Sequence, residues 1–329
     1  MAQNHQTLVT MTNVLGARQV TQPHVWHTPL LPSPALSTLS GREVYLKLEC
    51  WQRTGSFKVR GALNKLASLS PEEWSRGIVT ASAGNHGLGV AYACQVLGLP
   101  PVTIFVPENA PAAKVTRLAA HTCQVRQEGA DYDSTHALAE AFCQAHDALY
   151  ISAYDDPTVI AGQATAGLEA LEDLPDADLF IVPVGGGGLI AGIALIAKAI
   201  NPAVRILGVQ PAASPSAHLS LRDGHPYETY AAAPTICDGL AGGFGRLPFE
   251  LAAALIDDVL VVPEADVRHA VSWLLAQEQL VVEGSGAIAI APLLNGQLRT
   301  AAKKIVAVLT GRNLDAALLQ EILAEWTDP

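Results

Sequence analysis

The chain alternates short apolar runs with longer segments whose apolar residues recur every three to four positions. The longer segments His86–Leu97, Asp131–Ala145 and Ala265–Gln277 have the period and the end signals of helices. The short runs are rich in β-branched residues and predict strands at Val44–Glu49, Ile78–Ser82, Val102–Val106, Thr122–Arg126, Leu149–Ser152, Leu179–Val184, Arg205–Val209, Val259–Val262 and Lys304–Leu309. Strands that alternate with helices predict an α/β fold with mainly parallel sheets flanked by helices.

Several of the predicted strands are apolar on both faces and do not alternate with polar residues, as expected for central strands covered on both sides. One uncharged apolar run, residues 179–197, meets the crude length requirement for a membrane span. Pro183 and four consecutive glycines divide it, however, so we expect a buried strand, a loop and a buried helix. No repeat or linker marks a domain boundary. A second domain would therefore be inserted within the first.

The composition describes a packed globular protein. Of the 329 residues, 50% are hydrophobic and 16% are charged, which excludes a disordered chain. The net charge of −11 argues against nucleic acid or an anionic membrane as a partner. The five cysteines include no C-x-x-C pair, which argues against both a disulfide framework and a zinc site. Residues 1–16 lack the features of a secretion signal. We therefore expect a cytoplasmic protein.

The first segment with chemical potential is Thr54–Gly61, TGSFKVRG, directly after a predicted strand. Most lysines are solvated surface groups. Lys58, however, follows Phe57 in a turn rich in small residues at the start of a helix. The helix dipole and partial burial would lower the pKa of such a lysine, which suits it for Schiff-base chemistry.

Two further segments could bind anions. Ser82–Gly87, SAGNHG, is either an ordinary turn with an asparagine helix cap or a cradle of backbone N–H groups for a carboxylate. The glycines Gly185, Gly186, Gly187 and Gly188 lie between an apolar strand and an apolar helix, where a flexible linker is not expected. Such a loop lets backbone amides surround a phosphate, and it matches no nucleotide-binding signature.

A fourth segment, Thr310–Asn313, follows the last predicted strand, and by itself it could be a routine turn. The four segments together, in this order, resemble the threonine/serine dehydratase branch of the fold-type II pyridoxal-phosphate enzymes, to which serine racemase also belongs. The resemblance covers nearly the whole chain, because intermediate segments also agree: Thr28–Leu30, Asp155–Gln163, Asp238–Leu240 and Glu283–Ala287.

The resemblance implies two domains, a large one from residues 1–52 and 153–329 and a small one from residues 53–152, and a homodimer or homotetramer. It also implies no C-terminal regulatory domain. The cofactor would be pyridoxal 5′-phosphate, held by Phe57, Lys58, Asn85, Gly185, Gly186, Gly187, Gly188, Glu283 and Thr310. The amino-acid substrate would contact Ser82, Ala83, Asn85, His86 and Gly239.

The roles implied by the resemblance centre on Lys58, which would hold the cofactor covalently and then remove the Cα proton of the substrate. Phe57 would pack beside the cofactor ring, and Asn85 would bind its phenolic oxygen. The hydroxyl of Thr310 would face the pyridine nitrogen and leave it largely unprotonated, which favours loss of a β-substituent. Ser82, Asn85 and His86 would hold the substrate carboxylate.

Three departures from the family pattern affect these expectations. Ala83 replaces the serine that acts as the second base in racemisation, so we expect poor racemase activity. Gln210 and Ser216 replace the acidic ligands of the family's divalent-metal site, so we expect no metal there. Arg312 stands where many relatives have glycine, and Tyr154 replaces a common phenylalanine; the sequence does not say what either does.

The leading hypothesis is therefore an ammonia-lyase that converts L-threonine or L-serine to a 2-oxo acid and ammonia. Arg312 motivates an alternative, a dehydratase for a larger 3-hydroxy amino acid such as 3-hydroxyaspartate, phenylserine or a hydroxyectoine-derived acid. A non-catalytic ligand-binding homologue is the other alternative, and the intact Lys58 argues against it.

Overall fold

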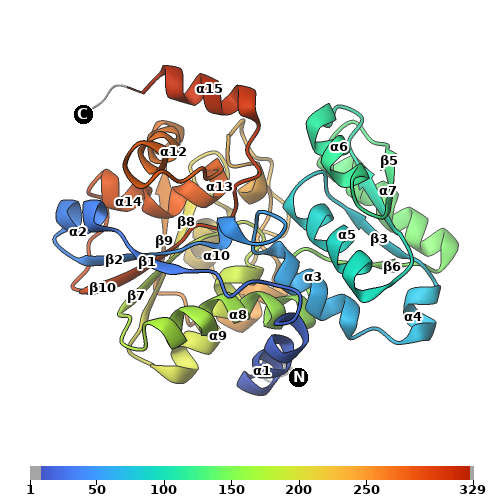
Figure 1. The fold of residues 1–329 in the computed structure, drawn as a ribbon, viewed down its shortest axis with the longest axis horizontal. Coiled ribbons are helices and arrows are strands. Elements are labelled where there is room, and N and C mark those ends of the chain that lie inside the picture. The colour runs from blue at the N-terminus through green and yellow to red at the C-terminus, as the bar shows by residue number, and fades with distance from the viewer. Residues whose placement is uncertain (1–8, 327–329) are drawn as a thin grey trace.

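The structure, a computed structural model, describes residues 9–326 and contains two β-sheets (Figure 1). The larger sheet has the strand order β1-β2-β10-β7-β8-β9, and the smaller has the order β5-β4-β3-β6. All neighbouring strands are parallel except β1, which is antiparallel to β2. The strands are β1 Leu30–Pro32, β2 Glu43–Lys47, β3 Ile78–Ala81, β4 Val102–Val106, β5 Cys123–Gln127, β6 Leu149–Tyr150, β7 Leu179–Pro183, β8 Arg205–Pro211, β9 Asp258–Val262 and β10 Lys304–Val308.

Helices cover both faces of each sheet (Figure 1). Along β7, Phe180 and Val182 pack against one helical layer, while Leu179 and Ile181 pack against the other. The helices are α1 Met11–Thr21, α2 Pro34–Ser40, α3 Lys58–Ala67, α4 Pro71–Ser75, α5 Asn85–Leu97, α6 Ala112–Ala119, α7 Tyr132–His146, α8 Pro157–Asp173, α9 Gly188–Ile200, α10 Ser216–Asp223, α11 Arg246–Ala252, α12 Glu264–Glu278, α13 Gly284–Ala287, α14 Ala291–Leu294 and α15 Ala316–Ala324, with short 3₁₀ helices η2 Glu49–Trp51, η3 Asp238–Leu240 and η4 Ile288–Ile290.

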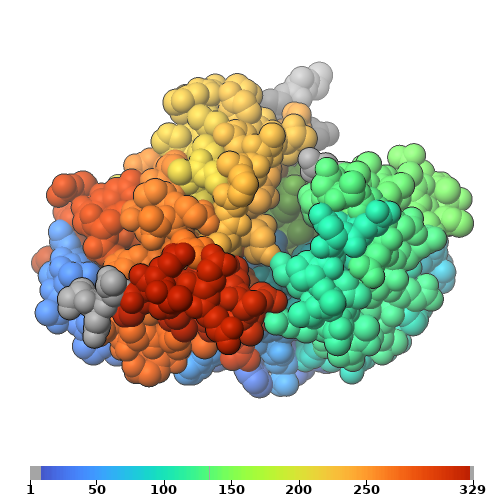
Figure 2. All heavy atoms as spheres, turned by 90° about the horizontal axis from the view of Figure 1, so that it is seen from above, coloured from blue at the N-terminus to red at the C-terminus, as the bar shows by residue number. Residues whose placement is uncertain are grey.

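The smaller sheet forms a separate lobe, seen in cyan and green beside the rest of the molecule in Figure 2. Its core joins α3 and α5 to one face of the sheet and α7 to the other. Helix α3 also packs closely against α8 of the larger layer, because Gly61 and Gly162 bring the two backbones together. The domain boundaries at residues 53 and 152 stay a prediction.

The secondary structure agrees well with the sequence-based expectations. All nine predicted strands occur within two residues of their predicted ends, and the three predicted helices occur within one residue. The run 179–197 is a strand, a glycine loop and a helix, as predicted, and no helix within residues 9–326 is long and apolar enough to cross a membrane. Residues 1–8, half of the segment tested for a secretion signal, lie outside the described residues.

Candidate active site

The four candidate segments follow the carboxyl ends of strands or open the helices next to them. The glycine loop follows β7, Thr310 follows β10 and Ser82 follows β3. Ligands of open α/β sheets bind at this end of the strands. Two of the segments are joined directly, because Ser56 forms a bridge with Gly311 and the Phe57 N–H donates to the Thr310 carbonyl at 3.1 Å.

Lys58 is the first residue of α3, and its side chain is partly buried. Burial lowers the pKa of Lys58 to about 8. Its Nζ donates to the carbonyl oxygen of Ala153 at 3.0 Å and lies 5.2 Å from the centre of the Phe57 ring. The lowered pKa makes the neutral amine, the form that attacks a carbonyl group, more accessible than in an ordinary lysine.

The glycine loop is shaped so that side chains cannot be added to it. A Cβ on Gly186 would lie 2.3 Å from the Tyr154 ring, and one on Gly185 would lie 2.8 Å from the Gly239 carbonyl oxygen. Gly187 has a φ of +95°, a conformation that favours glycine, and Gly188 begins α9. The loop thus presents bare backbone at a helix N-terminus, where the helix dipole favours an anion.

Asn85 belongs to a chain of polar side chains that joins three of the segments. Its Nδ2 donates to Glu283 Oε1 at 2.6 Å, and its Oδ1 accepts from Asn313 Nδ2 at 2.6 Å. Asn313 Nδ2 also donates to the Thr54 carbonyl at 2.9 Å. Burial, together with the nearby Asp238 carboxylate, raises the pKa of Glu283 to about 7. This chain fixes the orientation of the Asn85 amide.

The imidazole of His86 is neutral. Burial, with a further contribution from the Lys58 charge, lowers its pKa to about 3. The Nε2–H donates to the Ile151 carbonyl at 3.0 Å, which leaves Nδ1 as an acceptor. An acceptor nitrogen repels a carboxylate, so the ring itself is poorly suited to hold one.

Three other predicted site residues hydrogen-bond to protein groups, two of them to Ser285. Thr310 Oγ1 donates to the Ser285 carbonyl at 3.2 Å, and the Gly239 N–H donates to Ser285 Oγ at 3.0 Å. Ser82 Oγ accepts from the Gly84 N–H at 3.2 Å, in the turn that precedes α5. Ala83 lies partly buried in the same turn and offers only a methyl group.

The residues present fit a phosphate-bearing aldehyde cofactor. Four buried side-chain atoms have no hydrogen-bond partner among the described residues: Thr54 Oγ1, Ser56 Oγ, His86 Nδ1 and Gln163 Oε1. Thr54 and Ser56 precede Lys58 in the turn before α3, and His86 lies at the start of α5. Gln163 lies next to the glycine loop, because a Cβ on Gly188 would lie 2.5 Å from Gln163 Oε1. An amine, an anion cradle and unpaired polar atoms thus surround one region.

A family model described as "Pyridoxal-phosphate dependent enzyme" matches residues 21–311. The chain belongs to this family. Among similar proteins is the L-threonine ammonia-lyase of Thermotoga maritima, which is 42% identical over 317 residues, 96% of this chain and 78% of the relative. The catabolic L-threonine dehydratase of Escherichia coli K12 is 38% identical over 319 residues, 95% and 96% of the two chains. The solved structure of maize serine racemase is 33% identical, with a TM-score of 0.89 over 96% of this chain and 97% of that one.

Membership of the family confirms pyridoxal phosphate as the cofactor and the fold-type II class of the enzyme. The sequence analysis gave no role to Gln163. Its Nε2 donates at 3.0 Å to the Ala153 carbonyl, the same oxygen that accepts from Lys58. Asn313 also received no role from the sequence. A buried glutamine within the otherwise apolar start of α8 is the signal that could have identified Gln163.

Proposed function

We propose that the enzyme is an ammonia-lyase that converts L-threonine or L-serine to a 2-oxo acid and ammonia. The relatives named as L-threonine ammonia-lyase or L-threonine dehydratase support the reaction. The observation that carries the proposal is the Lys58 amine, with its lowered pKa, in the region bounded by the glycine loop. When bound, pyridoxal phosphate withdraws electrons from the substrate Cα and so acidifies its proton.

In this proposal Lys58 holds the cofactor and then accepts the Cα proton of the substrate. The glycine loop and the N-terminus of α9 bind the phosphate, and Phe57, Asn85, Glu283 and Thr310 surround the ring. Overall, the Cα proton and the β-hydroxyl would be lost together as one molecule of water, which would convert the substrate to an enamine. The released enamine becomes an imine, and water hydrolyses it to the 2-oxo acid and ammonia.

The substrate carboxylate is proposed to bind the turn Ser82–Gly87. Its ligands would be backbone N–H groups at the start of α5 and the Ser82 hydroxyl, since helix N-termini attract anions. His86 would contribute its backbone N–H group and not its ring, because Nδ1 of the neutral ring can only accept a hydrogen bond. The Gly239 carbonyl lies beside Gly185 of the glycine loop, so Gly239 would line the site next to that loop.

Ala83 leads to a prediction about stereochemistry. Racemisation needs a proton donor on the face of Cα opposite Lys58, and the methyl group of Ala83 cannot donate. Wild-type enzyme should therefore eliminate L-serine with little conversion to D-serine, whereas Ala83→Ser should raise the ratio of racemisation to elimination by about tenfold or more. Chiral chromatography of residual serine measures both rates. Substantial D-serine formation by the wild type would mean that another group serves that face.

Gln210 occupies a position where acidic ligands would be needed for a metal ion. Its Nε2 donates to the Val184 carbonyl at 3.1 Å and to Ser216 Oγ at 3.4 Å, while its Oε1 accepts from the N–H groups of Ala217 and His218. The uncharged Gln210 amide thus forms hydrogen bonds with backbone groups, including the carbonyl of Val184, which directly precedes the glycine loop. Calcium and magnesium need several oxygen ligands, including carboxylates.

We accordingly predict that divalent cations do not affect the enzyme. Excess EDTA, followed by millimolar magnesium or calcium, should change kcat by less than about 1.5-fold and leave the melting temperature unchanged. Activity assays and thermal melts of the same samples provide the test. A large loss of activity with EDTA that magnesium or calcium reverses would show that the enzyme has a functional metal site and would contradict this prediction.

Arg312 does not support the alternative of a larger substrate. Its exposed side chain lines a surface cavity of about 410 Å³ together with Trp26, His27, Thr28, Pro29 and Trp51, none of which is a predicted site residue. Steady-state kinetics with L-threonine, L-serine, 3-hydroxyaspartate and phenylserine, read as 2-oxo acid formed, tests the substrate class. We expect the highest kcat/KM for L-threonine or L-serine. A higher kcat/KM for 3-hydroxyaspartate or phenylserine would contradict the proposal and support the alternative.

The proposal also includes a cytoplasmic location and assembly as a homodimer or homotetramer. The five cysteines are unpaired, as expected in a reducing compartment. Trp26, Leu31 and Leu39 are among the large hydrophobic residues exposed on a single chain, and association would cover such surface. Light scattering coupled to gel filtration measures the assembly directly.

A further inference from the structure

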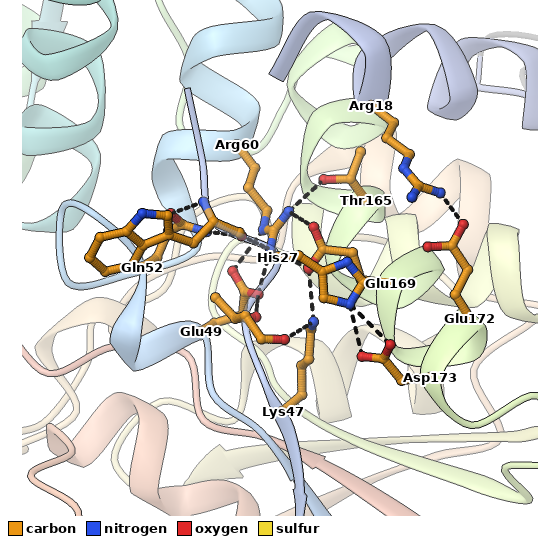
Figure 3. Close-up of polar contacts among 12 residues, drawn as sticks. Arg18, His27, Lys47, Glu49, Gln52, Arg60, Thr165, Glu169, Glu172 and Asp173 are labelled. Atoms are coloured by element: carbon orange, nitrogen blue, oxygen red, sulfur yellow. Dashed lines mark hydrogen bonds and ion pairs between the residues drawn. The ribbon is translucent and has the colours of Figure 1, made fainter. Parts of the chain in front are cut away.

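Four charged side chains are buried together behind the start of α3 (Figure 3). Lys47 and Glu49 come from β2 and η2, Arg60 comes from α3 and Glu169 comes from α8. Lys47, Glu49 and Arg60 have no exposed surface, and Glu169 is 6% exposed. The two positive and two negative charges balance. We call these residues the Arg60 cluster.

Arg60 is the centre of the Arg60 cluster, and its guanidinium uses a planar fork of donors on both carboxylates. Nε and Nη2 donate to Glu49, each at 2.8 Å. Nη1 and Nη2 donate to the two oxygens of Glu169, each at 2.7 Å. Lys47 Nζ donates to Glu169 at 2.8 Å, so the carboxylate is held from two sides. Arg60 is thereby fixed directly to η2 and α8, and Glu169 links it to Lys47 of β2.

The Arg60 cluster lies on the side of α3 that faces away from Lys58. Residues two positions apart leave a helix about 200° apart around its axis, so Arg60 and Lys58 point in nearly opposite directions. No side chain of the described residues caps the N-terminus of α3, which leaves its first turn without the usual local anchor. The backbone of α8 also packs closely here, because a Cβ on Gly162 would lie 2.5 Å from the Arg60 carbonyl oxygen. Backbone packing and the charge pairs therefore hold one side of this turn.

We propose that Arg60 is a positioning residue for the reaction, acting through Lys58. By binding the back of the first turn of α3 to β2, η2 and α8, the Arg60 cluster sets the direction in which the Lys58 side chain enters the site. A buried, charge-paired arginine holds an orientation better than a lysine would, because its fork fixes angles as well as distance. This inference rests on the role proposed for Lys58.

Glu169→Gln, Glu169→Asp and Arg60→Lys test the inference in the purified holoenzyme. The matched control is Glu172→Gln, on the same helix α8, which removes an ion pair with Arg18 at the partly exposed surface (Figure 3). For each variant we would measure kcat and KM for L-threonine, the absorbance spectrum of the bound cofactor, the dissociation constant of added pyridoxal 5′-phosphate from the apoenzyme, and the melting temperature.

We expect Glu169→Gln and Arg60→Lys to lower kcat by at least about tenfold, since small misplacements of a reacting group are costly. KM should change by less than about threefold, and the cofactor spectrum and affinity should shift. Glu172→Gln should stay within about twofold of the wild type in every property. Glu169→Asp keeps the charge but withdraws the carboxylate by one methylene, so a positioning role predicts an intermediate kcat and an altered spectrum.

A lower melting temperature with wild-type kcat and spectrum in Glu169→Gln or Glu169→Asp would overturn the inference and leave the Arg60 cluster a purely structural feature. If Glu169→Gln and Arg60→Lys do not fold, the milder Glu169→Asp decides between the two roles. Lys58→Ala separates this inference from the proposed function. Activity in Lys58→Ala would refute the role of Lys58, whereas an inactive Lys58→Ala beside a fully active Glu169→Asp would refute only the positioning.

Discussion

Lys58→Ala should lower the turnover of L-threonine by about 10⁴-fold or more while the protein stays folded. The substitution removes the attachment point of the cofactor and the acceptor of the Cα proton in one step. Among the described residues, Lys58 Nζ has one hydrogen-bond acceptor, the Ala153 carbonyl, so its loss leaves no buried charge unpaired and the fold should survive. Single-turnover and steady-state formation of the 2-oxo acid give the loss, and circular dichroism checks the fold.

Two further variants sharpen this test. Lys58→Arg keeps a positive charge but has no neutral amine at any relevant pH, so it should be as inactive as Lys58→Ala. Lys65→Ala, on the same helix, removes an ion pair with Asp156 and should keep nearly full activity. A folded Lys58→Ala enzyme that binds cofactor and still turns over at a tenth of the wild-type rate would exclude Lys58 as the catalytic residue.

Gly187→Ala should weaken cofactor binding by at least about tenfold and lower the melting temperature. At a φ of +95° any side chain strains the backbone, and the new Cβ would lie 2.3 Å from the Phe244 ring and 2.8 Å from Pro248. The loop must therefore move, which displaces the N–H groups that we propose to hold the phosphate. Spectroscopic titration of the apoenzyme with pyridoxal 5′-phosphate measures the affinity.

Gly98→Ala is the matched control for Gly187→Ala. Gly98 ends α5 with a φ of +67°, and nothing lies within 4 Å of the position its Cβ would take. It should cost about 1 kcal/mol of stability from strain alone and leave the cofactor affinity unchanged. Equal cofactor affinities in Gly98→Ala, Gly187→Ala and the wild type would show that the glycine loop does not form the phosphate site.

The elements of this fold were predictable because most strands are buried on both faces, and continuous apolar runs are a strong local signal. The strand β1 was missed because Leu30–Pro32 is short, lies at the sheet edge and contains a proline. The order of the strands was not predicted. It depends on which crossover each chain segment takes, and no local pattern encodes that choice.

The candidate site shows the same division between local and distant information. The motifs around Lys58, Asn85 and Gly187 are contiguous in sequence, so their residue types indicate a cofactor directly. The Arg60 cluster joins side chains up to 122 residues apart. In the sequence Glu169 resembles any other acidic residue of a helix, and only the packing of α3 against α8 shows that it is buried and paired.

The position of β10 has a consequence for how the chain acquires its structure during synthesis. This strand lies between β2 and β7, pairing residues near position 305 with residues near positions 44 and 179. All strands of the smaller sheet, by contrast, lie between residues 78 and 150 and can pair as soon as they leave the ribosome. The larger sheet must wait, with one edge of β2 and one edge of β7 unpaired, until the chain has been made as far as Val308. Thr310 and Asn313 follow that strand, so cofactor capture should be among the last events of folding, and the nascent chain should depend on chaperones until then.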